Sequence, residues 1–97
     1  MPTYGKTERF KKDYADLSPE ARKRFKNAVK KFVEDLRAGR PFRKGLRVKG
    51  VKGASGIFEM TWADDGRATF EFGDEGREGE THIIWRRVGA HDVFGEP

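Results

Sequence analysis

Apolar residues recur with a helical period in the N-terminal part of the chain and with a strand period further on. A first amphipathic stretch begins at Thr7, whose hydroxyl can accept a free amide at a helix N-terminus. Ser18 and Pro19 then provide a second N-cap and a first-turn proline, and Gly39 provides a left-handed stop. The pattern predicts two helices joined as an antiparallel hairpin, the second over about residues 19–38.

Polar and apolar residues alternate with a period of two in the second half of the chain, as in strands with one buried face. Turn residues at 63–66 predict a hairpin, with Gly66 tolerating a positive φ, and a polar Gly-rich loop is expected at 73–79. Tyr4–Lys6 is a candidate edge strand. The alternating segments, each expected to form a strand, are residues 46–49, 57–62, 67–72 and 81–88.

These elements predict a single α+β domain over residues 1–97. The N-terminal helical hairpin packs on one face of an antiparallel sheet of about four strands, which gives two layers. A chain of 97 residues accommodates one hydrophobic core and leaves no room for a large ligand cavity beside it.

Several classes of protein are excluded by composition. The sequence has no cysteine and two histidines, which excludes a disulfide scaffold, a thiolate metal site and a His-rich centre. No apolar run approaches the roughly 18 residues of a membrane span, and residues 1–12 lack the apolar stretch of a signal peptide. We therefore expect a cytoplasmic protein that uses no metal, no small-molecule cofactor and no membrane.

The charge is divided unevenly along the chain. Residues 1–52 carry 17 Lys and Arg against 6 Asp and Glu, whereas residues 53–97 carry 4 against 10. This segregation favours a basic surface that binds a polyanion, with RNA or DNA preferred to a membrane. A soluble, highly charged protein without such a partner is the alternative.

Basic residues are densest around the first strand expected after the helices. Arg47 and Lys49 stand two positions apart and should point to the same side, opposite Leu46 and Val48. Such a strip can bind phosphates, or it can protect an edge strand from aggregation. The other members of this cationic strip are Arg40, Arg43, Lys44 and Lys52.

Two charged residues of the middle strands are candidates for chemistry. Glu59 is either a general base or an ordinary solvent-face residue, paired with a cross-strand arginine such as Arg67. Arg67 opens a strand after a tight turn, where its guanidinium can bind a phosphate bidentately and stabilise the transition state of phosphoryl transfer. Solvation of the hairpin end is the simpler interpretation of Arg67.

The C-terminal stretch combines cations, aromatic rings and a histidine. The imidazole of His91 can give or take a proton near neutral pH, and Phe94 or Trp85 can stack on a base. Arg86 and Arg87 are candidates for RNA contact. The structural alternative is that His91 caps the last turn and Phe94 fills the edge of the core. A chain without a nucleophile motif can still cleave RNA, because the 2′-hydroxyl is the nucleophile.

The order and spacing of several segments resemble the RelE/ParE toxin superfamily of bacterial toxin–antitoxin modules. The Gly89-Ala90-His91 ending with a following aromatic residue is similar to the YafQ-like and HigB-like branches, which are ribosome-dependent mRNA endonucleases. ParE-like members instead inhibit DNA gyrase and usually lack this histidine. The matching segments, which cover nearly the whole chain, are Phe10–Asp13, Leu17-Ser18, Leu46–Gly50, Gly56–Met60, Gly66–Phe70 and Arg87–Phe94.

The resemblance implies roles at the matching positions. Arg67 falls on the arginine that family nucleases use on the scissile phosphate, and His91 on the residue used for acid–base work or charge stabilisation. Phe94 falls near the aromatic residue used for base contact, one position closer to the histidine than in YafQ. Glu59 and Thr61 stand where RelE has a lysine pair, which is closer to the pattern of HigB.

The resemblance also implies a function and partners. The first hypothesis is a type II toxin that cleaves mRNA on the ribosome and inhibits translation, with a cognate antitoxin as its protein partner. A ParE-like gyrase inhibitor is the second hypothesis. The third hypothesis is a catalytically degenerate binding module with the toxin fold. The absence of the RelE lysine pair is the reason to retain this hypothesis.

Overall fold

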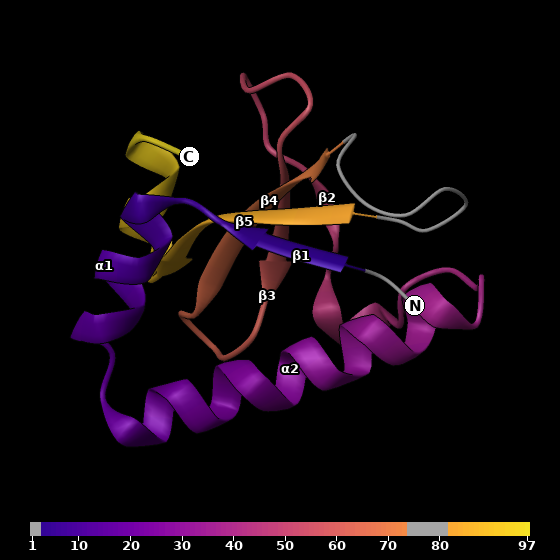
Figure 1. The fold of residues 1–97 in the computed structure, drawn as a ribbon, viewed down its shortest axis with the longest axis horizontal. Helices are drawn as coiled ribbons and strands as arrows, with labels where there is room; N and C mark the ends of the chain where they lie inside the picture. The colour runs from indigo at the N-terminus through magenta and orange to yellow at the C-terminus, as the bar shows by residue number, and fades with distance from the viewer. Residues whose placement is uncertain (1–2, 74–81) are drawn as a thin grey trace.

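The computed structural model of the protein describes residues 3–73 and 82–97 (Figure 1). The expected loop at 73–79 therefore lies outside these residues except for Gly73, and so does Thr81. The elements in chain order are β1 (Thr3–Lys6), α1 (Glu8–Asp16), α2 (Pro19–Arg37), the 3₁₀ turn η1 (Lys44–Leu46), β2 (Lys49–Gly50), β3 (Phe58–Thr61), β4 (Arg67–Gly73), β5 (His82–Gly89) and the 3₁₀ turn η2 (His91–Gly95).

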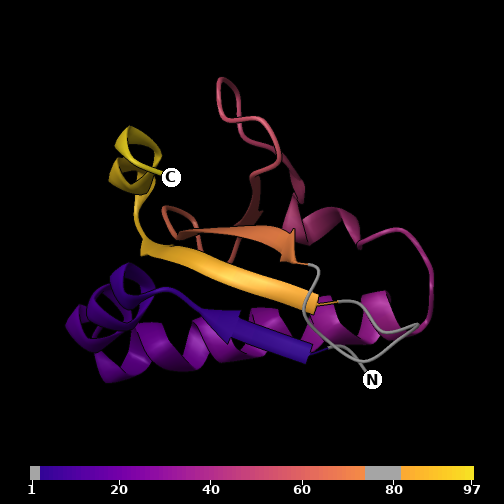
Figure 2. The same ribbon diagram turned by 45° about the horizontal axis from the view of Figure 1, so that its top comes forward.

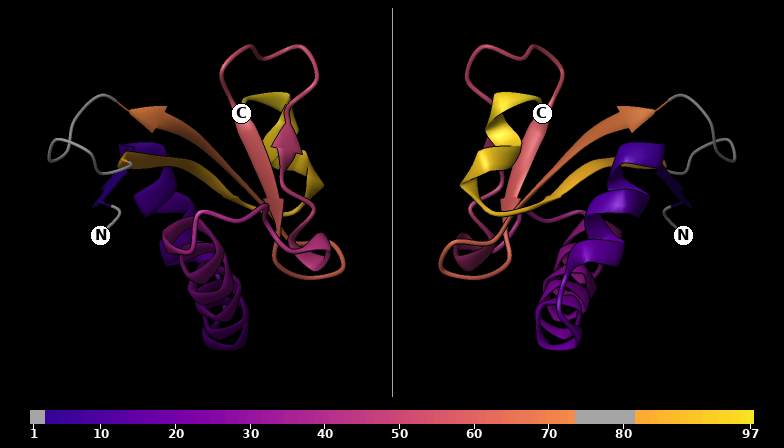
Figure 3. Two further views of the ribbon diagram at one scale, coloured as in Figure 1. Left: turned by 90° about the vertical axis from the view of Figure 1, so that its right-hand side faces the viewer. Right: turned by 90° about the vertical axis from the view of Figure 1, so that its left-hand side faces the viewer.

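The strands form one mixed sheet in the order β1-β5-β4-β3-β2. β2 to β5 are antiparallel neighbours, whereas β1 pairs parallel with β5 along Thr3–Lys6. The predicted α+β architecture is confirmed, with five strands in place of about four. Both helices lie on one side of this sheet, and η2 lies on the other (Figures 2 and 3). We call the side away from α2 the open face.

Local capping determines where both helices begin. The Thr7 hydroxyl accepts a hydrogen bond from the Phe10 amide at 3.1 Å, and the Ser18 hydroxyl accepts one from the Ala21 amide at 3.1 Å. Gly39 follows α2 with a φ of 68°, as predicted for a left-handed stop. The two helices meet at an angle rather than lying side by side as an antiparallel hairpin (Figure 1). Within the part of the chain that the structure describes, no helix has the length and apolar character needed to span a bilayer.

Aromatic rings form the centre of the core between the helices and the sheet. Phe32 on α2 packs against Phe70 at 5.1 Å and against Trp85 at 5.5 Å between ring centroids. Phe25 meets the same tryptophan at 5.6 Å. Trp85 is only 3% exposed, so its rings have no free face for a base. The expectation that Trp85 binds RNA is therefore wrong.

The strand expected over residues 46–49 is mostly absent. Lys44–Leu46 forms the turn η1, and Arg47 has a left-handed φ of 48°, which breaks the alternation of the chain. Only Lys49 and Gly50 pair with β3. Arg47 and Lys49 therefore do not share a strand face, and the cationic strip does not form as predicted.

Two glycines at strand ends lie in close packing with a neighbouring side chain. A Cβ at Gly66 would lie 2.6 Å from the Trp62 ring, although Gly66 is not among the glycines with positive φ in the described ranges. The tolerance of Gly66 for a positive φ is therefore not used, and the hairpin needs the glycine for space. A Cβ at Gly89 would lie 3.1 Å from Val93, so Gly89 lets η2 fold back on the end of β5.

Candidate functional site

A row of four side chains crosses the open face from one strand to the next. Directly opposed residues in an antiparallel sheet project from the same face, and the register pairs Lys49 with Glu59, Glu59 with Thr69, and Thr69 with Arg87. A neighbouring row pairs Thr61 with Arg67 and Arg67 with Gly89. Three predicted site residues of the sheet, Glu59, Lys49 and Arg67, therefore lie within two adjacent rows.

Glu59 has a basic partner, but a different one from the arginine expected. Its carboxylate lies 3.7 Å from the Lys49 ammonium, and its side chain is 12% exposed against 70% for the lysine. Arg67 faces Thr61 in the register, so it is not the cross-strand partner of Glu59. The site thus contains a nearly buried carboxylate with one exposed cation beside it.

The guanidinium of Arg67 is oriented by its own hairpin turn. Its Nη1 atom donates to the carbonyl oxygens of Ala63 at 3.3 Å, Asp64 at 3.3 Å and Gly66 at 2.9 Å. These are backbone acceptors, so they hold the positive charge in place, and no carboxylate of residues 3–73 or 82–97 forms an ion pair with it.

His91 begins η2 two residues after Gly89, which lies opposite Arg67 in the sheet. The backbone therefore brings the histidine position close to the strand that carries the arginine. The His91 side chain lies outside what the structure describes. Val93 rather than Phe94 is the buried residue of η2, at 1% exposure, and Phe94 is half-buried.

The C-terminal segment covers part of the open face and accepts a hydrogen bond from Arg86. The Pro97 carbonyl oxygen accepts from the Thr69 hydroxyl at 3.2 Å and from Arg86 Nε at 3.1 Å. Arg86 also forms an ion pair with Glu71 at 3.0 Å. Arg86, a predicted RNA contact, is engaged in holding this segment against the sheet.

Arg87 joins the sheet to α1. Its Nε atom lies 2.6 Å from the Asp13 carboxylate, and the two side chains are 12% and 14% exposed. Asp13 also accepts from the Val88 amide at 3.3 Å, and Arg87 donates to the Glu96 carbonyl oxygen at 3.1 Å. Arg87 therefore has a packing role, which corrects its assignment as an RNA contact.

Arg43 is likewise bound internally. It donates to Asp35 through its backbone amide, Nε and Nη2, each at 2.9 Å, and Arg40 Nε adds a fourth hydrogen bond at 2.9 Å. Arg43 also pairs with Glu34 at 3.2 Å. This network fixes the loop after α2, so Arg43 is not a free phosphate contact as predicted. Lys44 and Arg47 are exposed and form no ion pair within residues 3–73 and 82–97.

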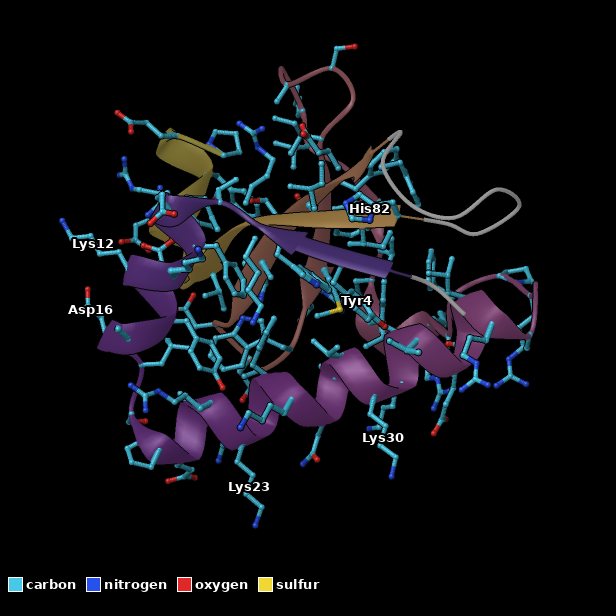
Figure 4. All side chains as sticks on the ribbon, viewed as in Figure 1. Tyr4, Lys12, Asp16, Lys23, Lys30 and His82 are labelled. Carbon is cyan, nitrogen blue, oxygen red and sulfur yellow. The ribbon has the colours of Figure 1, made fainter. Side chains whose placement is uncertain are left out.

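The Asp35 network predicts acid sensitivity. Hydrogen bonds from the Arg43 side chain and backbone hold the pKa of Asp35 well below its ordinary value. The carboxylate therefore stabilises the fold at pH values above about 4 and loses this contribution as the pH falls through the folded pKa. We expect Asp35→Asn to lower the melting temperature at pH 7 and to flatten its decline below pH 4. Asp16→Asn, on the solvent side of α1 (Figure 4), is the control and should change neither; equal curves for wild type and Asp35→Asn would contradict the prediction.

A cleft of about 690 Å³ lies between α2, η1 and the β3–β4 hairpin. We call it the basic cleft, because five of its lining residues are cations and one is a carboxylate, Asp64. The α2 side of the cleft, where Arg24, Asn27 and Lys31 follow at spacings of three and four, was not among the site residues predicted from the sequence. That spacing was a usable signal for one helix face. The cations of the basic cleft are Arg24, Lys31, Arg43, Arg47 and Arg67.

The chemical capacity of the site is that of acid–base and electrostatic groups. No group of three or more potential ligands for a metal ion occurs in the described portion of the chain. Glu59, Lys49 and the oriented Arg67 can accept a proton, donate one and stabilise a phosphate, respectively. Such a set suits a reaction in which the substrate supplies its own nucleophile.

Comparison with known proteins places the fold. No protein-family model matches the chain, and no curated protein matches it. A chain in the RelB–RelE antitoxin–toxin complex from Methanococcus jannaschii is similar, with a TM-score of 0.63, 20% identity and 95% of both chains covered. A chain in the Escherichia coli DinJ–YafQ toxin–antitoxin complex has a TM-score of 0.64 and 17% sequence identity, with 95% of this chain and 94% of that chain covered. The YoeB/ParE toxin from Agrobacterium tumefaciens has a TM-score of 0.66 and 13% sequence identity, with 92% of this chain and 98% of that chain covered. The chain has the same fold as these toxin structures, which confirms the fold that the resemblance implied.

Proposed function

We propose that the protein is the toxin of a type II toxin–antitoxin module and acts as a ribosome-dependent mRNA endonuclease. The observation that carries the proposal is the proximity of Arg67, fixed by its turn, to the Gly89–His91 segment at the end of the adjacent strand. The whole-chain likeness to RelE, YafQ and YoeB/ParE toxins supports it. The basic half of the sequence supports a polyanionic substrate.

The proposed reaction uses the RNA 2′-hydroxyl as nucleophile. Glu59 takes its proton, the 2′-oxygen bonds to phosphorus, and the bond from phosphorus to the 5′-oxygen breaks. Arg67 binds the phosphate and offsets the charge that develops on its oxygens. His91 gives a proton to the leaving 5′-oxygen. The products are a cyclic phosphate and a free 5′-hydroxyl, and no metal or organic cofactor takes part.

The proposed partners follow from the same likeness. Two of the similar structures are complexes of a toxin with an antitoxin. A cognate antitoxin would keep this chain inactive in the cytoplasm, and the ribosome would present its mRNA substrate. A surface with exposed cations such as Lys44 and Arg47 suits both an acidic antitoxin segment and ribosomal RNA.

Expression without an antitoxin should arrest growth, with protein synthesis failing before DNA synthesis. The reason is that mRNA cleavage removes the template for translation and leaves replication enzymes intact at first. Pulse labelling with methionine and thymidine after induction measures both rates. A strain that co-expresses the proposed cognate antitoxin is the control and should grow normally.

Two other results would contradict the proposal. DNA synthesis failing first would move the protein to the gyrase-inhibiting class, which the YoeB/ParE-like fold also accommodates. Normal growth with abundant folded protein would favour a catalytically degenerate binding module. The observation that favours such a module is that Glu59, which with Thr61 stands where RelE has a lysine pair, is held by Lys49 in an ion pair.

A further inference from the structure

The basic cleft brings together cations from parts of the chain that are distant in sequence. Arg24 and Lys31 come from α2, Arg47 from the end of η1, and Arg67 from the start of β4. Like charges repel, so gathering them around one concavity costs free energy unless an anion enters. Asp64 is the one acidic residue among the lining residues.

The cations of the cleft divide into fixed and available groups. Arg67 is fixed by carbonyl oxygens and Arg43 by the buried Asp35. Arg24 forms an exposed ion pair with Glu20, at 2.9 Å, which water and salt weaken. Lys31 and Arg47 are exposed and have no ion-pair partner in the residues that the structure describes. The cleft therefore offers one oriented guanidinium and two charges free to bind a ligand.

The cleft also continues from the proposed catalytic position. Thr61 and Arg67, which form one row with Gly89 on the sheet, line the cleft on its β3–β4 side. A strand whose scissile phosphate lies at Arg67 can thus extend its neighbouring phosphates toward α2.

We propose that the basic cleft binds backbone phosphates of the RNA strand next to the cleavage position, with Lys31 and Arg47 as the main contacts. This inference deepens the proposed function and rests on it for the direction of the strand. The observations favour RNA over an acidic peptide, because the apolar lining residues leave little surface for an anchor: Ala28 and Leu46 are 6% and 4% exposed, and Trp62 and Ala63 are half-buried. A peptide would need apolar anchors in such a cleft, whereas phosphates need only the cations.

The test compares two variants that each remove two charges. Lys31→Gln/Arg47→Gln alters the cleft, and glutamine keeps a side chain at the left-handed position of Arg47. Lys23→Gln/Lys30→Gln is the matched control, because both lysines lie on α2 and point away from the sheet (Figure 4). The probe is a labelled single-stranded RNA with 2′-O-methyl groups, which binds but cannot be cleaved. Dissociation constants are measured between 50 and 200 mM salt, with the melting temperature of each variant.

The cleft variant should bind the RNA at least about tenfold more weakly than the control at low salt. Each lost phosphate contact lowers the log–log salt slope by about 0.7, so the slope should fall by about 1.4. Equal binding by the two variants would overturn the inference. Weaker binding of a poly-glutamate peptide with unchanged RNA binding would overturn it too, and would reassign the cleft to an acidic peptide. If the double variant unfolds, Lys31→Gln alone must lower the slope by about 0.7.

The experiment distinguishes a failure of the inference about the basic cleft from a failure of the proposed function. A wild-type protein that binds the probe through the cleft but leaves ribosome-bound mRNA intact supports the inference and contradicts the proposed function. A wild-type protein that cleaves mRNA, with a cleft variant that binds like the control, does the opposite.

Discussion

Alanine at His91 or at Arg67 is expected to lower mRNA cleavage by about 10²–10⁴-fold while the protein stays folded. Loss of a positioned acid or base costs about 10²–10⁴-fold in rate, and loss of a donor that stabilises transition-state charge costs about 10²–10³-fold. Arg67 lies at the surface end of a hairpin, and its Nη1 contacts are to backbone carbonyls of its own turn. Removing the side chain should therefore cost little stability.

The measurement is cleavage of a defined message on purified ribosomes, per folded molecule, with the melting temperature recorded for each variant. Conservative replacements sharpen it: Arg67→Lys keeps the charge but loses the planar fork, so we expect an intermediate rate. His91→Gln keeps polarity without proton transfer at neutral pH, so it should resemble alanine. A His91→Ala variant with a lowered melting temperature and near-normal cleavage would show a structural histidine. Wild-type rates in both alanine variants would refute the assignment of the site.

The parts of the fold that depend on neighbouring residues were predictable from the sequence. Thr7 and Ser18 cap helices through amides three residues away, so the signal for each helix start is entirely local. The parallel pairing of β1 with β5 was not predictable, because it joins Thr3–Lys6 to a strand nearly 80 residues later. Nothing in the alternation of Tyr4–Lys6 specifies which strand is its neighbour.

The site residues show the same limit. Arg43, Arg86 and Arg87 are cations in sequence, and each was expected to face RNA. Their partners are Asp35, Glu71 and Asp13, at separations of 8, 15 and 74 residues. The net charge of the sequence includes these three arginines as if they were free to bind RNA, whereas the fold pairs each of them with a carboxylate. The cations left to a polyanion are fewer than the sequence indicates, and two of them, Lys31 and Arg47, face one cleft.

The ion pair of Asp13 and Arg87 should be the strongest electrostatic contact for stability outside the Asp35 network. Both side chains are more than four-fifths buried, and the pair joins α1 to β5 and, through the Glu96 carbonyl, to the C-terminal segment. Removing one partner leaves a nearly buried charge without compensation, which typically costs about 3–5 kcal/mol. We expect Asp13→Ala and Arg87→Ala each to lower the free energy of unfolding by about that amount.

A double-mutant cycle distinguishes this packing role from RNA binding. If the pair is structural, the Asp13→Asn/Arg87→Met protein should be more stable than the sum of the single changes predicts, by a coupling of about 1–3 kcal/mol. Urea unfolding of the four proteins measures this coupling.

An Arg87 that contacts RNA would behave differently. Arg87→Met would weaken RNA binding with little loss of stability, and Asp13→Asn would leave RNA binding unchanged or make it stronger, because it frees the guanidinium. Arg87 also anchors the segment that follows His91, because it donates to the Glu96 carbonyl oxygen. If its role is structural, Asp13→Asn and Arg87→Met should therefore both reduce cleavage, because each would displace η2 from the end of β5.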